Sequence, residues 1–193
     1  MAKPLDDDRK SLIFTSRISQ SEKNALFAYG EAYPESGLKE RFQRTIEPVV
    51  LNRMMLAQGA LEVARMLLAQ PQTEAVLRAV INRAYYAIHH SIRAIMLYKY
   101  QSEADGHEEA IKELENLLKD KTDRARCGLD EFFFERAIEA RDNRSIADYS
   151  PFDWSRREGT VTWFNLTDDS WKSAAEFNVA VAEQMYIAAY RYL

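Results

Sequence analysis

The most regular pattern of apolar positions runs from Leu77 to Tyr100, a stretch that contains neither proline nor glycine. Its apolar residues recur at steps of three and four, at Leu77, Ile81, Ala84, Ile88, Ile92 and Ile95. This spacing follows one face of an α-helix, in which side chains repeat about every 3.6 residues. The sequence therefore predicts a long amphipathic helix here, at the centre of the core.

A second helix is predicted between Pro48 and Pro71, where apolar residues have the same spacing, at Val50, Met54, Ala57, Leu61, Ala64 and Leu68. Proline fits the first turn of a helix, because its missing N–H is not needed there. The link from this helix to the central one, AQPQT, is short. Short links join antiparallel neighbours, so we expect these two helices to run in opposite directions.

Further helices are predicted at about 107–118, 129–149 and 171–193, and the charged segment 119–128 between two of them is predicted to be a loop. Asn178 lies on the apolar face of the last helix, so it needs a hydrogen-bonding partner if it is buried. The predicted fold class is all-α, an antiparallel bundle of four to five helices.

Two segments are predicted to lie outside the bundle of residues 48–193. Residues 1–47 are interpreted as an N-terminal extension that is too short for a core of its own, with a helical piece at 38–47 that ends at Pro48. Residues at about 152–168 contain glycine, two tryptophans and the β-favouring run TVTWF. This second segment is interpreted as an irregular insertion with a β-hairpin piece.

Charge and cysteine content narrow the classes of function. With 193 residues and a net charge of −4, the chain does not resemble a generic nucleic-acid coat, so any contact with RNA must come from a local patch. The single cysteine, Cys127, allows no internal disulfide, which fits a reducing compartment. No apolar run approaches the ~20 residues of a membrane span, and the start MAKPLDDDRKS lacks the apolar core of a secretory signal. We expect a cytoplasmic protein with no membrane partner.

The polar side of the central helix is the first candidate site. Arg83, Tyr86 and His90 lie in one line along it, with His89 beside them. Imidazole suits proton transfer because its unperturbed pKa is about 6.5, and arginine suits phosphate binding. Alternatively, the tyrosines and one histidine pack under neighbouring helices with their polar tips hydrogen-bonded. Both interpretations stay open.

A metal site is not expected. Adjacent helical residues such as His89 and His90 point about 100° apart, so they do not readily share one ion. His107 is the third and last histidine, and the single Cys127 cannot form a cysteine pair. We therefore expect neither zinc nor another cofactor.

The second candidate site lies near the end of the helix predicted at 129–149. Arg144 and Asp148 are four residues apart, which is the spacing of a surface ion pair within one helix. The functional alternative is that Asp148 holds Arg144 for a phosphate or nucleotide, with Arg141 and Ser145 nearby.

Two motifs resemble the HEPN family. Arg83-Ala84-Tyr85-Tyr86-Ala87 followed by His90 resembles the RAYYAxxH signature of one HEPN subgroup, and the segment from Arg144 to Tyr149 resembles its R-x-x-A-D-Y signature. The likeness covers about residues 51–193, without the insertion. It implies a small helical bundle of the kind found in RNA-cleaving toxins and nucleotide-associated modules, often as a homodimer.

In nuclease members of that family, the resemblance implies metal-independent RNA cleavage by an R-x(4–6)-H motif. Here Asp148 and Tyr149 occupy the window after Arg144 in which the histidine should fall. An aspartate with an ordinary pKa of about 3.9 is a poor general acid at neutral pH. The missing histidine after Arg144 favours a module that binds a nucleotide, RNA or a partner protein and is not a standard HEPN nuclease.

Three functions follow as hypotheses. The first is such a binding module, with Arg141, Arg144, Ser145, Asp148 and Tyr149 at one edge and Arg83, Tyr86, His89 and His90 beside it. The resemblance further implies a toxin–antitoxin-like pair with a nucleotidyltransferase partner. The second is a metal-independent ribonuclease toxin with a rearranged site, for which Arg144, His90 and Arg83 are the catalytic candidates. The third is a structural adaptor bundle.

Overall fold

The computed structural model describes residues 38–100, 106–149 and 168–193, and in these ranges the chain is helical without any strand. The helices are α3 (Leu38–Leu68), α4 (Glu74–Tyr100), α5 (His107–Lys119), α6 (Lys121–Cys127), α7 (Phe133–Tyr149) and α8 (Asp168–Tyr192). The predicted all-α bundle is confirmed. The described residues hold six helices, where four to five were expected.

Helix α4 is the centre of the bundle, as predicted. It contacts α3, α5, α7 and α8. Its predicted apolar face, from Leu77 through Ile81, Ile88 and Ile92 to Ile95, is at most 2% exposed. Complete burial of one such side chain contributes roughly 1.5–3 kcal/mol, so this face is a main source of the bundle's stability.

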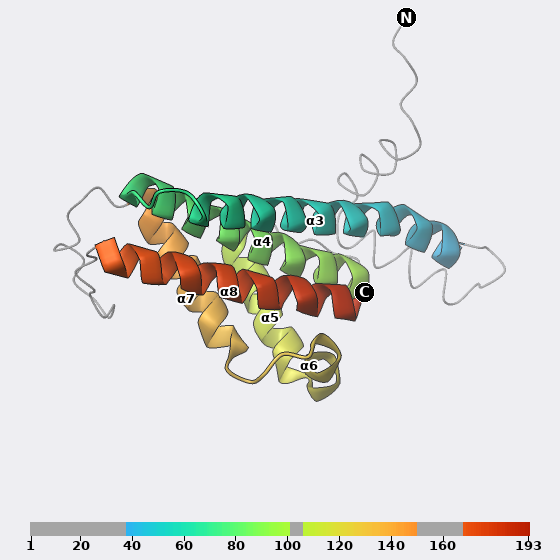
Figure 1. The fold of residues 1–193 in the computed structure, drawn as a ribbon. Coiled ribbons are helices and arrows are strands. Elements are labelled where there is room, and N and C mark those ends of the chain that lie inside the picture. Colours follow the sequence, from blue (N-terminus) through green and yellow to red (C-terminus); the bar gives the residue numbers. More distant parts are fainter. Residues whose placement is uncertain (1–37, 101–105, 150–167) are drawn as a thin grey trace, which may run out of the picture.

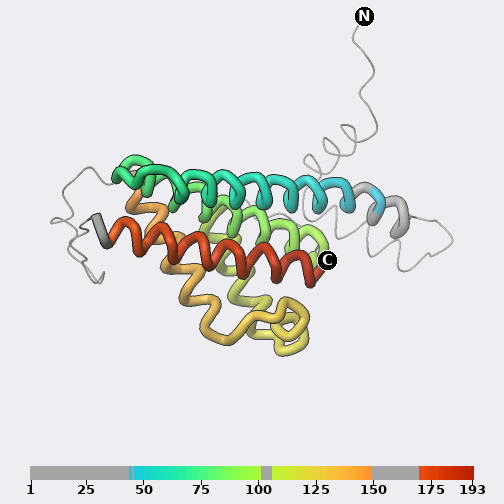
Figure 2. Tube along the Cα trace, viewed as in Figure 1, coloured from blue at the N-terminus to red at the C-terminus, as the bar shows by residue number. Residues whose placement is uncertain are grey.

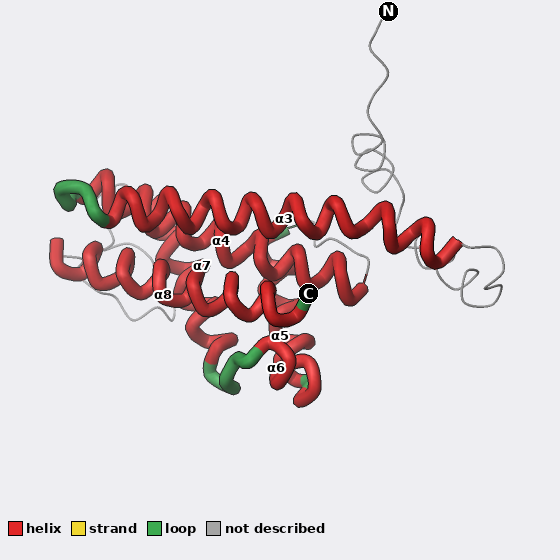
Figure 3. Tube along the Cα trace, turned by 45° about the vertical axis from the view of Figure 1, so that its right-hand side comes forward, coloured by secondary structure: helices red, strands yellow, loops and turns green. Residues whose placement is uncertain are grey.

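The helices around α4 lie on two sides of it: α3 and α8 on one side, and α5 and α7 on the other. Figure 1 shows α3 and α8 side by side, with α4 packed behind both. The chain reverses direction between α3 and α4, as the short link predicted, and Figure 2 follows this path. Helices α5 and α7 cross the other side of α4, and α6 lies at the far end of α5 (Figure 3).

One predicted helix end is wrong. Helix α3 runs without a break through Pro48, where a helical piece was expected to stop. Proline removes one backbone hydrogen bond and crowds the preceding turn. However, Ile46, Val49 and Val50 on either side of it are all buried in the core. Their packing holds the helix continuous across the proline.

The loop predicted at 119–128 is also wrong, because α6 forms there. Asp120 caps the helix through its Oδ1, which accepts hydrogen bonds from the backbone N–H groups of Thr122 at 2.8 Å and Asp123 at 3.1 Å. Gly128 ends it in the left-handed conformation, with φ of 67°. The high charge of the segment suggested a loop, although Asp120 and Gly128 are typical residues for the two ends of a helix.

Two polar residues, Asp123 and Asn178, fasten the outer helices to the core. Asp123 of α6 forms an ion pair with Lys99 and accepts a 2.7 Å hydrogen bond from the hydroxyl of Tyr192. The buried Asn178 has the partners that its position requires: it donates to the carbonyl of Ala140 at 3.0 Å and accepts from Asn143 at 2.9 Å. These contacts tie α6 and α7 to α4 and α8.

The insertion predicted at 152–168 and residues 1–37 of the extension fall outside the described residues, apart from Asp168, so both stay predictions. None of the described helices is long and apolar enough to cross a membrane.

Candidate functional site

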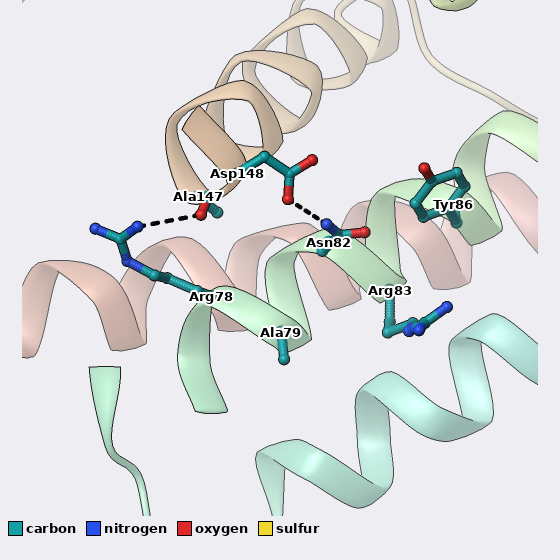
Figure 4. Close-up of a pocket in the computed structure, with 7 residues that line it drawn as sticks. All are labelled: Arg78, Ala79, Asn82, Arg83, Tyr86, Ala147 and Asp148. Atoms are coloured by element: carbon teal, nitrogen blue, oxygen red, sulfur yellow. Dashed lines mark hydrogen bonds between the residues drawn. The ribbon is translucent and has the colours of Figure 1, made fainter. Parts of the chain in front are cut away.

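The C-terminal end of α7 is held against the first half of α4. Asn82 donates a hydrogen bond from its amide to Oδ1 of Asp148, and Arg78, one turn earlier, donates to the carbonyl of Ala147 at 3.2 Å. Figure 4 shows both side chains reaching from α4 to the last turns of α7. The crossing of the two helices is therefore fixed by polar contacts.

A pocket of ≈ 440 Å³ opens at this crossing. It is lined by Arg78, Ala79, Asn82, Arg83, Tyr86, Ala147 and Asp148. Arg83 is exposed and forms no ion pair with any described residue. A guanidinium and an aromatic ring thus border the same opening.

Arg144 lies beside the pocket, under Tyr86. It forms the predicted i,i+4 ion pair with Asp148 at 2.7 Å, and the two side chains are only 13% and 20% exposed. Its guanidinium carbon lies 5.9 Å from the centroid of the Tyr86 ring, within cation–π range. Because the pair is partly buried, solvent and salt screen its attraction less than that of an exposed pair. Asp148 therefore fixes the direction of the Arg144 side chain.

All three histidines of the chain meet next to Tyr86. His107, the first residue of α5, lies with its ring centroid 4.4 Å from that of His89 and 6.0 Å from that of Tyr86. His90 lies 6.3 Å from Tyr86 and 5.7 Å from His89. Tyr85 completes the group, 5.4 Å from His107.

Burial and nearby positive charges keep the imidazoles of His89 and His107 neutral. Burial, together with the charges of His107 and Arg93, lowers the pKa of His89 to about 3. The pKa of His107 is also lowered, first by burial and then by Arg144 and Arg93. Burial raises the pKa of Tyr85 to about 12, so its hydroxyl keeps its proton at neutral pH. The cluster therefore offers neutral imidazoles and a phenol in a positive field.

The described residues contain no group of three His, Cys, Asp or Glu side chains placed to hold a metal ion. Cys127 lies at the other end of the bundle, and burial raises its pKa to about 11. Its thiol stays protonated at neutral pH, so Cys127 is not an activated nucleophile.

The structure brings only part of the predicted site together. Arg83, Tyr86 and Asp148 line the pocket, and Arg144 and His90 lie beside it. His89, by contrast, is 6% exposed behind His107. Arg141 forms an ion pair with its neighbour Asp142 at 2.8 Å, and Ser145 does not line the pocket. Tyr149 ends α7, and its side chain lies outside the described part.

Sequence reasoning missed Arg78 and the part played by His107. Arg78 precedes Asn82 and Tyr86 at steps of four, so the helical period was a signal for its place. The contact of His107 with α4 depends on how α5 crosses that helix, and no local pattern encodes that angle.

No model of a known protein family matches this chain, and no curated protein matches it. The likeness to HEPN domains therefore rests on the two sequence motifs alone and stays a prediction.

Proposed function

We propose that the pocket between α4 and α7 binds the phosphate group and base of a nucleotide or of single-stranded RNA, in a HEPN-like binding module. One observation carries this proposal: the exposed Arg83 and the Tyr86 ring line one pocket, and the guanidinium of Arg144 lies 5.9 Å from the centroid of that ring, in a chain of net charge −4. Arginine binds phosphate in two-pronged geometry, and an aromatic face accepts any base by stacking.

The local charge of the site favours an anionic ligand. Arg78 and Arg83 line the pocket, and Arg144 and Arg93 lie close enough to lower the pKa of His107. Asp148 is the acidic residue that lines the same pocket. A phosphate would therefore meet a local excess of positive charge, even though the whole chain is acidic.

Binding to a labelled single-stranded oligoribonucleotide, followed by fluorescence anisotropy, tests the proposal. Arg83→Ala should weaken binding by about tenfold and reduce its salt dependence by about one unit of slope. The exposed Lys112→Ala on α5 removes one positive charge elsewhere and is the matched control. Equal loss in both variants, or no binding by the wild type, would contradict the proposal.

A specific observation favours metal-independent RNA cleavage as a second candidate function. The Tyr86 ring has Arg144 at 5.9 Å, His107 at 6.0 Å and His90 at 6.3 Å. Two histidines and the arginine thus surround one ring, and Arg144 lies close enough to His107 to lower its pKa, although no histidine follows Arg144 in sequence. A neutral imidazole can accept the proton of a ribose 2′-hydroxyl, and Arg144 can stabilise charge on the phosphate.

An RNA-cleavage assay with and without EDTA separates the two candidates. Cleavage that survives EDTA and disappears in Arg144→Ala and His90→Ala supports the ribonuclease. Binding without cleavage by the wild type supports the binding module. The absence of both binding and cleavage would favour the structural adaptor. A homodimer and a nucleotidyltransferase partner stay predictions from the resemblance, and co-purification with such a partner would test the second.

A further inference from the structure

Three buried polar atoms without a hydrogen-bond partner among the described residues gather beside the first turn of α5. They are the hydroxyl of Tyr85, Nδ1 of His89 and Nδ1 of His107. The ring of His107 lies 4.4 Å from that of His89 and 5.4 Å from that of Tyr85. Buried polar atoms in proteins nearly always have partners, so three orphans in one place indicate a polar species that binds among them.

The surrounding charges favour an anion over a metal cation. Arg93 and Arg144 both depress the pKa of His107, and Arg141 and Arg144 act in the same direction on Tyr85. The phenol of Tyr85 keeps its proton, so it can donate a hydrogen bond to an anion. A metal ion would have to enter this field against several guanidinium groups.

Every helix packed against the cluster contributes to this field. Arg53 comes from α3 and acts on His89; His90, Arg93 and Tyr86 come from α4; Arg141, Arg144, Asp142 and Asp148 come from α7. The first turn of α5 itself carries Glu108 and Glu109, both exposed. Basic groups therefore outnumber acidic ones among the groups that α3, α4 and α7 present to the histidines.

The start of α5 adds backbone donors. Gly106 is its N-cap and makes no side-chain capping bond. The first N–H groups of a helix lack partners within the helix and bind anions readily. His107, the first residue of this helix, is only half-buried, so this side of the cluster borders solvent.

We propose that Tyr85, His89, His107 and the first turn of α5 form a site for a terminal phosphate monoester, the phosphorylated end of RNA or of a mononucleotide. The number of donors carries the choice of ligand class. An internal phosphodiester has two free oxygens and one charge, whereas a monoester has three terminal oxygens and up to two charges. Three side-chain donors and the α5 backbone match the monoester.

This inference rests on the proposed function, because Tyr86 separates the phosphate site from the pocket. A base stacked on Tyr86 would place an attached terminal phosphate on the side of His107, 6.0 Å away. Binding of a dianion beside neutral imidazoles favours their protonated form, so the ligand enters together with a proton. His107 is then the residue that receives it, because it lies nearer to solvent than His89.

Three versions of one labelled oligoribonucleotide test the site: a 5′-phosphate, a 3′-phosphate and hydroxyl groups at both ends. One phosphorylated version should bind about tenfold more tightly than the hydroxyl version. His107→Gln should abolish that preference, so that all three versions bind with similar affinity. Tyr85→Phe should reduce it, and the exposed Lys112→Gln on the same helix should not alter it. Circular dichroism confirms that each variant is folded.

Calorimetry in two buffers of different ionisation enthalpy measures the number of protons taken up on binding. A purely structural role of His107 would not change this number. The phosphorylated oligonucleotide should bind with net proton uptake between about pH 6 and about pH 8, and His107→Gln should lose this uptake. Equal affinity for all three oligonucleotides, or uptake unchanged in His107→Gln, overturns the phosphate site while the proposed function stands. Failure of every oligonucleotide to bind overturns both.

Discussion

Asp148, at the C-terminal end of α7, contacts two helices at once: it accepts a hydrogen bond from Asn82 of α4 and forms a 2.7 Å ion pair with Arg144 of its own helix. The same carboxylate therefore fixes the helix crossing and orients the arginine. A replacement of Asp148 should affect both stability and ligand binding.

Asp148→Asn should lower the free energy of unfolding by about 1–3 kcal/mol, because the largely buried Arg144 loses its counter-charge. Urea denaturation measures this change. Asp142→Asn on the same helix is the control, since its ion pair with Arg141 is more exposed and should cost at most about 0.5 kcal/mol. Equal losses in the two variants would show that Asp148 has no special part in the crossing.

The same Asp148→Asn variant should bind single-stranded RNA at least as tightly as the wild type at low salt. Removal of the carboxylate takes one negative charge from the pocket and frees Arg144 for phosphate. Anisotropy titration checks this result. A large loss of affinity in a folded variant would mean that Asp148 itself positions the ligand.

Asn178→Ala should destabilise the protein by about 2–3 kcal/mol. The side chain is fully buried, and its loss leaves the carbonyl of Ala140 and the amide of Asn143 without their shared partner. Asn52→Ala, an exposed asparagine of α3, is the control and should change stability little. Thermal unfolding of the two variants should differ by several degrees; similar melting temperatures would contradict the role of Asn178.

Two glycine substitutions should have opposite effects on stability. Gly128→Ala should cost about 1–2 kcal/mol, because φ there is 67°, a left-handed conformation that residues with a Cβ rarely adopt. Gly59→Ala, in the interior of α3 with nothing within 4 Å of the new Cβ, should stabilise by about 0.5–1 kcal/mol. Urea denaturation of both variants gives the comparison. A stabilising Gly128→Ala would show that α6 does not end as described.

The buried His89 should make stability fall as the solution becomes acidic. Its folded pKa of about 3 is below the unfolded value of 6.5, so the unfolded state binds a proton first as the pH falls through 6.5. The stability lost between about pH 7.5 and about pH 5 is about 2 kcal/mol from this group. His89→Gln cannot be protonated, so its stability should fall less over the same range. Parallel pH profiles for the two proteins would contradict the lowered pKa.

The apolar periods of the sequence predicted most of the bundle because burial decides where helices lie. Leu77 and Ile95 belong to a continuous apolar face that is stable only when it is buried in the core, and both are buried as expected. One local signal failed because tertiary packing overrode it: Pro48 is typical of a helix start, but its buried neighbours keep α3 continuous. Helix α6 was missed for a different reason, because its capping residues Asp120 and Gly128 lie in a charged segment that was interpreted as a loop.

The candidate site was predictable only within single helices. The spacing of Arg83, Tyr86 and His90 placed them on one side of α4, and the spacing of Arg144 and Asp148 predicted their ion pair. The approach of His107 was not predictable, because it depends on the angle at which α5 crosses α4. A residue that comes from another helix leaves no periodic trace in the sequence around the site.

The unbroken helix α3 also has a mechanical consequence. Its first residues, from Leu38, extend past the end of α4 (Figure 1). The ten residues before Pro48 span about 15 Å as a helix. Residues 1–37 are thus attached to the end of a helix that projects beyond α4. A partner that held this end would act on α3, which packs along the pocket-lining helix α4.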